Sequence, residues 1–145
     1  MDNEIGKEPL LVVAPSFLDE LGHFEYINEI ANGLSTEFNV KVLCQTYKDS
    51  SLNHKVSNNI QLILEDFNTL SLGDSLNTKI LLKNIPVFRN ILHGIFKILF
   101  NIKIHKFVRN SEFRKVLYLE AEPMSFLLFN YFNKEIIMTL HAVDF

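Results

Sequence analysis

The chain has 145 residues, of which 48% are hydrophobic and 21% charged, and its formal net charge is −3. This composition is typical of globular proteins and argues against an intrinsically disordered chain. A protein of this length can bury about two-thirds of the surface of its unfolded chain. We therefore expect one domain, residues 1–145, with a hydrophobic core of its own.

The charges are distributed unevenly along the chain. Residues 1–78 contain four Lys and twelve Asp or Glu, residues 79–115 contain nine Lys or Arg and one Glu, and residues 116–145 contain one Lys and four acids. These three segments carry −8, +8 and −3. The basic segment is therefore local, and its charge needs a separate explanation.

The sequence indicates a cytoplasmic protein. Cys44 is the single cysteine, so no internal disulfide can form, which fits a reducing compartment. The first residues, MDNEIGKEP, are polar and acidic, unlike a secretory leader. The longest apolar-rich stretch, residues 85–108, is interrupted by basic residues such as Arg89, Lys97 and Lys103, which argues against a membrane span.

Five short apolar segments predict buried β-strands. They are residues 9–14 (PLLVVA), 39–45 (NVKVLCQ), 59–65 (NIQLILE), 114–121 (RKVLYLEA) and 135–140 (EIIMTL). The first two are separated by a helical pattern, residues 23–38, with Ile27, Ile30, Ala31 and Leu34 on one face. We interpret Gly33 as a point of close packing near the end of this helix.

Two more helices are expected in the second half of the chain. Pro86 fits the first turn of a long helix, because its missing N–H is not needed there. This helix carries an apolar stripe at helical spacing, formed by Phe88, Ile91, Leu92, Ile95, Phe96 and Leu99. Residues 123–133 predict a short apolar helix, whereas the spacing in residues 66–84 is too irregular to predict an element.

This alternation of elements predicts an α/β fold: a three-layer, Rossmann-like domain with a mainly parallel open sheet of about five strands flanked by helices. Right-handed crossovers place the ligand crevice of such a sheet at the carboxyl ends of its strands. The segments expected at that edge are residues 15–22, 120–123 and 141–145, and the residues that follow Gln45.

The loop after the first strand, PSFLDELG, is the first candidate site. A glycine such as Gly22, just before a helix, lets backbone N–H groups approach an anion, and the helix dipole favours negative charge there. The motifs G-x-G-x-x-G and G-x-x-x-x-G-K-[ST] are absent, which disfavours NAD binding of the usual kind and P-loop chemistry. The alternative is that Gly22 only closes a turn.

The order of segments resembles a known family. A strand ending in Ala-Pro precedes a loop in which Gly22 and His23 open a helix, and NEIANGLSTEFNVKVL, VLYLEAEPMSFLLF and IIMTLHAVDF follow. This series resembles the N-terminal domain of a GT-B fold glycosyltransferase and, more narrowly, is similar to the retaining glycosyltransferase family 4 over nearly the whole chain. Glu29, Ala31 and Leu34 approximate the E-x-A-x-x-L core of the family's first helix. Family members often carry two adjacent glycines in the first loop, where this chain has Leu21 before Gly22.

The resemblance implies a role for His141, at the end of the fifth predicted strand. In the family, the histidine at this place faces the cleft between two domains and contacts the donor sugar or organises the transition state. We therefore expect His141 to be the catalytic residue. A histidine at a strand end can also be a hydrogen-bonded structural residue, and this alternative stays open.

Substrate binding is expected from residues around the same edge. Two carboxylates at neighbouring positions of one strand, Glu120 and Glu122, cannot straddle a sugar as a glycosidase pair does. Binding of an acceptor hydroxyl by Glu122 is one interpretation, and capping of the following helix near Pro123 is the other. The substrate-binding residues that the resemblance favours are Ser16, Gly22, His23, Glu122 and Asp144.

The basic segment, residues 79–115, has two interpretations of similar weight. Its apolar stripe can pack in the core with the Lys and Arg side chains in solvent. Alternatively, a basic helix that contains aromatic residues suits an anionic membrane surface, which would make the protein peripheral at the inner face of the membrane. Nucleic acid is not an expected partner, because no recognised binding motif accompanies the charge.

No metal or other cofactor is expected. His93 and His105 are twelve residues apart, and Cys44 has no Cys or His at ligand spacing. Ser16 lacks a G-x-S-x-G elbow, and Cys44 lies in an apolar strand, so neither is a candidate nucleophile.

We thus expect residues 1–145 to be the N-terminal domain of a retaining glycosyltransferase, which transfers a sugar from a nucleotide-diphosphate sugar to a glycan, lipid-linked or small-molecule acceptor. In the family, a C-terminal domain binds most of the donor, and it is absent from residues 1–145, so we expect this fragment to be inactive alone. The alternatives are a free-standing flavodoxin-like binding or signalling domain and a scaffold without catalysis. A receiver domain fits poorly, because Asp19 and Glu20 lie too far beyond the first strand.

Overall fold

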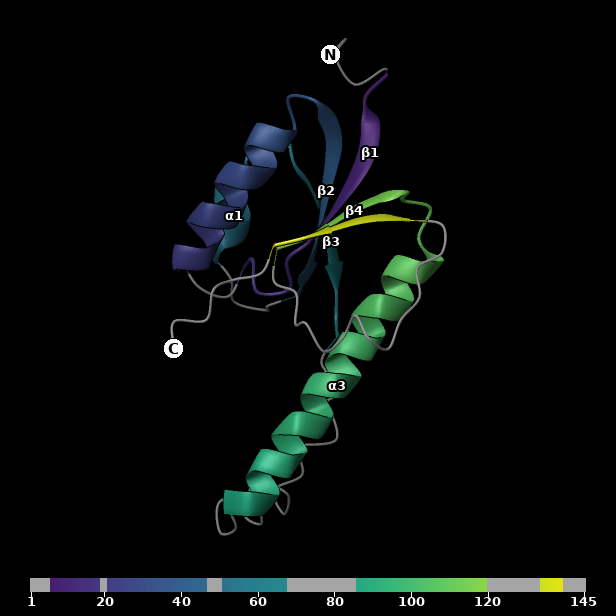
Figure 1. Ribbon diagram of the computed structural model, residues 1–145. Coiled ribbons are helices and arrows are strands. Elements are labelled where there is room, and N and C mark those ends of the chain that lie inside the picture. Colours follow the sequence, from purple (N-terminus) through teal and green to yellow (C-terminus); the bar gives the residue numbers. More distant parts are fainter. Residues whose placement is uncertain (1–5, 19–20, 47–50, 68–85, 120–133, 140–145) are drawn as a thin grey trace. The chain divides into compact units, whose positions relative to one another are not determined.

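The computed structural model describes residues 6–18, 21–46, 51–67, 86–119 and 134–139 (Figure 1). The chain divides into two compact units. One consists of Met1–Asp66 and Ser111–Phe145 and contains the sheet. The other is Phe67–Asn110, and its described part contains a long helix.

The first unit is built on a five-stranded sheet. Its strands are β1 (Glu8–Val13), β2 (Phe38–Gln45), β3 (Gln61–Glu65), β4 (Lys115–Tyr118) and β5 (Glu135–Met138). They lie in the order β3-β2-β1-β4-β5, and every neighbouring pair is parallel. The predicted α/β class with a parallel sheet is therefore confirmed, and the strand order is that of a Rossmann-like fold.

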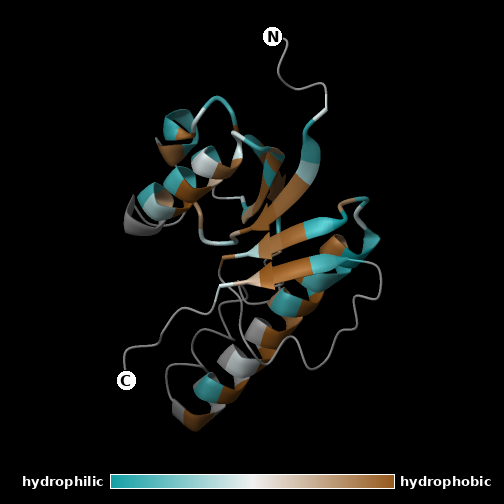
Figure 2. Cartoon of the chain, turned by 45° about the horizontal axis from the view of Figure 1, so that its top comes forward, coloured by the Kyte–Doolittle hydropathy of each residue, from teal (hydrophilic) through white to brown (hydrophobic). Residues whose placement is uncertain are grey.

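Both faces of the central strands are buried, as an all-parallel sheet requires. On one face the sheet packs against α1 (Leu21–Leu34), which lies along it in Figure 1. The core there includes Leu10, Val12, Val42, Cys44, Phe24, Ile27 and Ala31. The opposite face presents Leu11, Val13, Leu43, Val116 and Tyr118, all of them buried. Figure 2 shows the same pattern, with hydrophobic residues through the strands and hydrophilic residues where β4 and β5 begin.

Helix α1 begins two residues earlier than predicted and ends four residues earlier. After Leu34 the chain turns, and the Ser35 hydroxyl donates a hydrogen bond to the carbonyl of Asn32 at 2.6 Å. Thr36 closes the same end by donating from its hydroxyl to the carbonyl of Gly33 at 2.8 Å. The close-packing interpretation of Gly33 is wrong, since this residue is exposed and a Cβ there would meet no atom within 4 Å.

A short 3-10 helix, η1 (Ser51–Lys55), precedes β3 and was not predicted. It buries Leu52, and just beyond it the backbone N–H of Ser57 donates to the side-chain oxygen of Asn28 in α1 at 3.1 Å. The connection between β2 and β3 is thereby fixed to the helix that covers the sheet.

The second unit contains α3 (Pro86–Asn110), which begins at the predicted proline and runs for 25 residues. Within this unit the ring of Phe100 meets the ring of Phe67 edge-on, with centroids 5.9 Å apart. Ile91, Ile95 and Leu99 of the predicted apolar stripe are exposed, so the interpretation that these residues pack in the core is wrong. The side chains of Phe88, Leu92 and Phe96 are not among those described.

Most strand boundaries agree with the predicted ones within two residues, but β4 ends three residues early, at Tyr118. The predicted helix at residues 123–133 and nearly all of residues 66–84 lie outside the described residues. Among the helices that the structure describes, none is long and apolar enough to cross a membrane.

Candidate functional site

The candidate site is the edge of the sheet at which all five parallel strands end. In the order β3-β2-β1-β4-β5, the chain progresses outward from β1 in one direction and then continues from β4 on the other side. The switch point therefore lies between β1 and β4, and open α/β sheets bind their ligands in the crevice outside this point. Backbone hydrogen bonds extend the ladder here beyond the strands, from Ala14 N–H to Leu43 O at 3.0 Å and from Leu119 N–H to Val13 O at 3.1 Å.

The loop after β1 is held firmly against the core. Its backbone turns immediately, with the N–H of Phe17 donating to the carbonyl of Ala14 at 3.1 Å, and Pro15 O accepts from Gln45 N–H at 3.0 Å. The Phe17 ring is completely buried and stacks on Phe24 of α1, with centroids 5.0 Å apart and planes inclined by 6°. These contacts fix the backbone on both sides of Ser16, which is half-buried at the carboxyl edge.

The first turn of α1 follows at the same edge. Gly22 is the second residue of the helix, not the last residue of a loop as predicted, and His23 is the third. The first N–H groups of a helix have no partner within it, so the backbone of this turn offers donors at the positive end of the helix dipole. The helix contains no acidic residue in this turn that would occupy those donors.

A buried amide, which the sequence analysis did not single out, lies at the ends of β2 and β3. Gln45 is 3% exposed, and its side-chain nitrogen donates to a carboxylate oxygen of Asp66 at 3.0 Å and to the carbonyl of Thr46 at 3.4 Å. Asp66 is exposed, so this pair places a carboxylate of defined orientation at the carboxyl edge. The signal in the sequence is a pair of polar residues at the ends of two neighbouring apolar strands: Gln45 ends β2, and Asp66 directly follows β3.

Hydrogen bonds from one residue, Thr139, connect the ends of β4 and β5. Thr139 donates its backbone N–H to Tyr118 O at 3.0 Å, and its hydroxyl lies 3.2 Å from the carbonyls of both Tyr118 and Leu119. The ends of β4 and β5 are therefore neighbours at the carboxyl edge of the sheet. Glu122 follows Leu119 by three residues in the sequence, and His141 follows Thr139 by two.

The structure describes only part of the predicted site. Ser16 and the backbone of Gly22 and His23 lie at the carboxyl edge, as expected. The other three predicted residues, Glu122, His141 and Asp144, lie outside the described residues, and their roles remain predictions. Within the described ranges, no group of three or more His, Cys, Asp or Glu side chains could hold a metal ion.

Two buried titratable groups are unsuited to catalysis at neutral pH. Burial raises the pKa of the Cys44 thiol to about 12, so the reactive thiolate is scarce. Burial lowers the pKa of His105 to about 4, so this imidazole is neutral at pH 7.

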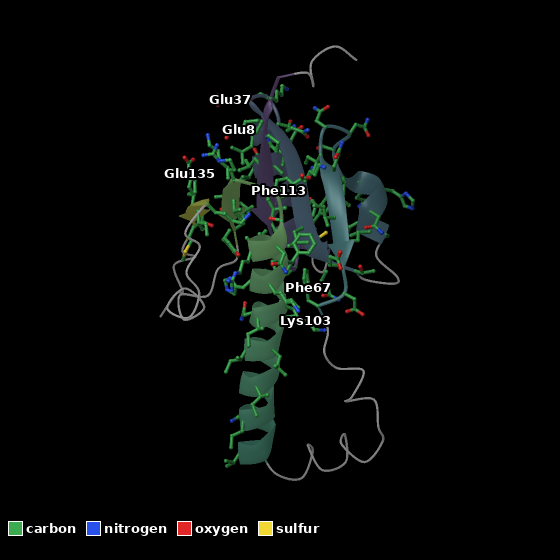
Figure 3. The ribbon with its side chains drawn as sticks, turned by 90° about the vertical axis from the view of Figure 1, so that its right-hand side faces the viewer. Glu8, Glu37, Phe67, Lys103, Phe113 and Glu135 are labelled. Atoms are coloured by element: carbon green, nitrogen blue, oxygen red, sulfur yellow. The ribbon has the colours of Figure 1, made fainter. Side chains whose placement is uncertain are left out.

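At the opposite edge, where the strands begin, charged side chains connect the strands to one another. Figure 3 shows Glu8, Glu37 and Glu135 near this end of the sheet. The ammonium of Lys115 lies 2.8 Å from Glu8 and 3.9 Å from Glu135, and the hydrogen bond to Glu8 raises the lysine pKa. Lys134 donates to the carbonyls of Ser111 and Phe113 at 2.8 and 2.6 Å, which ties the start of β4 to that of β5.

In comparisons with known proteins, no protein-family model, no curated protein and no solved structure matches this chain. The fold and the arrangement of the carboxyl edge are thus the basis for an inference about function.

Proposed function

We propose that this chain is the N-terminal, acceptor-side domain of a retaining GT-B-type glycosyltransferase similar to family 4. The observation that carries the proposal is the strand order, which puts the switch point of an all-parallel sheet between β1 and β4. Ser16 and the first turn of α1 follow β1 at this point. Glu122 and His141 follow β4 and β5 in the sequence, the two strands on the other side of the switch.

The chemistry of a nucleotide-diphosphate sugar fits such an edge. Its diphosphate is an anion, which the N–H groups and the dipole at the start of α1 favour. In this proposal Gly22 permits close approach of the backbone to a phosphate, because glycine has no Cβ. His141 contacts the donor sugar, and Ser16, Glu122 and Asp144 bind hydroxyl groups of the substrates. Transfer requires a donor-binding domain in addition to residues 1–145.

The strand order also favours this proposal over the flavodoxin-like alternative. Flavodoxin-like domains have the order 2-1-3-4-5, in which the switch point lies between the first and third strands. The order here, 3-2-1-4-5, belongs to the Rossmann-like class.

A pair of glycine variants tests the phosphate-facing role. Titration of residues 1–145 with UDP- and GDP-sugars, followed by amide NMR shifts, is expected to perturb Ser16, Gly22 and Thr139 and to leave Glu8 and Glu37 unchanged. We expect Gly22→Ala to weaken binding about tenfold, because the added Cβ obstructs backbone contacts with the ligand. Gly33→Ala, in the last turn of the same helix, is the matched control.

If Gly22→Ala leaves the affinity for the nucleotide sugar unchanged, Gly22 does not face a phosphate.

In a protein that also carries a donor-binding domain, His141→Ala is expected to lower the rate of transfer at least about a hundredfold, as expected for the loss of a group that stabilises the transition state. Normal turnover in that variant would show that His141 is a structural residue.

A further inference from the structure

Helix α3 carries a continuous exposed apolar face. Among the side chains of α3 that the structure describes, six aliphatic ones are exposed: Val87 (69%), Ile91 (55%), Ile95 (46%), Ile98 (55%), Leu99 (39%) and Ile102 (39%). They recur at spacings of three and four residues, so they lie on one side of the helix. From Val87 to Ile102 this face is about 22 Å long at the rise of an α-helix. Single exposed apolar residues are ordinary, whereas a continuous stripe of this length marks an interaction surface.

All Lys, Arg, Asp and Glu residues in the sequence of α3 are basic ones. Between Pro86 and Asn110 the sequence contains five Lys or Arg and no Asp or Glu. Lys103, Lys106 and Arg109 are exposed in the last two turns. Lys106 and Arg109 follow Ile102 by four and seven residues, so they continue the apolar face at its carboxyl end. Figure 2 shows hydrophobic and hydrophilic residues alternating along this helix.

We propose that α3 docks on the surface of an anionic lipid bilayer. The exposed face, from Val87 to Ile102, enters the boundary between headgroups and acyl chains, and Lys103, Lys106 and Arg109 contact the anionic headgroups. An interfacial helix combines these two features: an apolar face and a basic polar part attracted by the negative surface potential. This proposal does not depend on sugar transfer. It is independent of which ligand binds at the carboxyl edge of the sheet.

A second copy of the chain is a less suitable occupant of this face. Pairing two α3 helices would bring together two segments that carry only positive charge, and like charges at close range oppose association. An anionic surface instead neutralises Lys103, Lys106 and Arg109, which lie at the carboxyl end of the exposed face. The charge of α3 therefore favours the bilayer over self-association.

Vesicle co-sedimentation of the full chain tests the proposal. We expect binding to vesicles made of equal parts phosphatidylcholine and phosphatidylglycerol, and much weaker binding to phosphatidylcholine alone. Each basic residue near an anionic surface contributes about fivefold in affinity, so the triple variant Lys103→Gln, Lys106→Gln, Arg109→Gln is expected to bind about a hundredfold more weakly. The double variant Ile95→Gln, Ile98→Gln is expected to lose at least about tenfold, because it removes apolar area from the bilayer boundary.

Matched controls come from the sheet unit. Lys55→Gln and Leu64→Gln change an exposed lysine and an exposed leucine outside α3, and both are expected to bind vesicles normally. Circular dichroism of each variant establishes that its helix content is unchanged, so a loss of binding reports the surface and not the fold.

Three results would overturn the proposal: no binding to either kind of vesicle, equal binding to both, or equal losses in the controls. Lipid-free self-association that Ile95→Gln, Ile98→Gln abolishes would assign the face to a second copy instead. None of these results bears on the sugar titration, which follows the carboxyl edge of the sheet, so failure of one proposal is distinguishable from failure of the other.

Discussion

Ile27 in α1 and Ile91 in α3 are the same residue type, each within an apolar stripe at helical spacing. Ile27 is completely buried against the sheet, whereas Ile91 is 55% exposed. The difference shows what a periodic pattern specifies. It determines which residues share a face of a helix, but it does not determine whether that face meets the core, a partner or solvent. The charges help to decide, since residues 86–110 are basic without any acid.

Cysteine reactivity is expected to give the largest contrast between the core that buries Ile27 and the exposed face of α3. Cys44 packs in the same core as Ile27, and burial raises its pKa to about 12. At neutral pH its thiolate is about a thousandfold rarer than that of an ordinary cysteine. The variant Ile91→Cys adds a thiol on the exposed face of α3, and alkylation kinetics of this variant compare both thiols in one molecule.

We expect the thiol introduced by Ile91→Cys to react at the ordinary rate of an exposed cysteine, with a pH midpoint of about 8.5. Cys44 should stay unmodified until the protein unfolds or the pH approaches 12. Rapid alkylation of Cys44 in the folded protein would mean that the sheet unit opens easily, and the comparison would fail.

The next largest contrast is expected in stability. Ile27→Ala removes a fully buried side chain and leaves a cavity, and we expect the free energy of unfolding to fall by about 2–5 kcal/mol. Ile91→Ala, the identical change at an exposed position, is expected to alter it by no more than about 0.5 kcal/mol. Urea denaturation measures both, and a similar loss in the two variants would indicate that Ile91 is packed in solution.

The smallest contrast concerns helix propensity. Gly94 lies in the middle of α3, and a Cβ there would meet no atom within 4 Å. Gly94→Ala should stabilise the helix by about 0.5–1 kcal/mol, because alanine loses less backbone entropy than glycine. Amide hydrogen exchange in the middle of α3 should then slow by about twofold to fivefold, while exchange in β1 is unchanged. Slower exchange in β1 as well would show that the two units unfold together.

Much of the fold was predictable because local chemistry and tertiary structure agree. Residues 10–13 are four consecutive aliphatic residues, which suit a strand covered on both faces. Pro86 starts α3 because its fixed φ and missing N–H suit the first position of a helix. By contrast, η1 has no apolar periodicity, and Leu52 is its single buried residue. No pattern in the sequence therefore predicts this short helix.

The start of α1 was misjudged because Gly22 was treated as a loop residue. A glycine inside a helix costs only about 1 kcal/mol relative to alanine. The stacking of Phe17 on Phe24 and the burial of both rings anchor the first turn of the helix. Packing of this kind outweighs the local preference of one glycine.

The location of the candidate site was predictable, but its composition was only partly so. Parallel strands end at one edge, so Ser16 and the start of α1 could be placed there from the strand pattern alone. The contact between Gln45 and Asp66 could not, because it depends on the register of β2 against β3, which pairs Gln45 with Glu65.

The position of β1 in the sheet has a consequence for synthesis of the protein. Of the five strands in this sheet, β1 is translated before the others, yet it lies at the centre of the sheet between β2 and β4. Leu10 pairs with Lys115, so one side of β1 has no native partner until about a hundred further residues have been made. Such a delayed, long-range pairing slows folding and leaves a hydrophobic strand edge open to other chains. A nascent chain that has reached only β3 is therefore the species in which aggregation, or protection by a chaperone, should be sought.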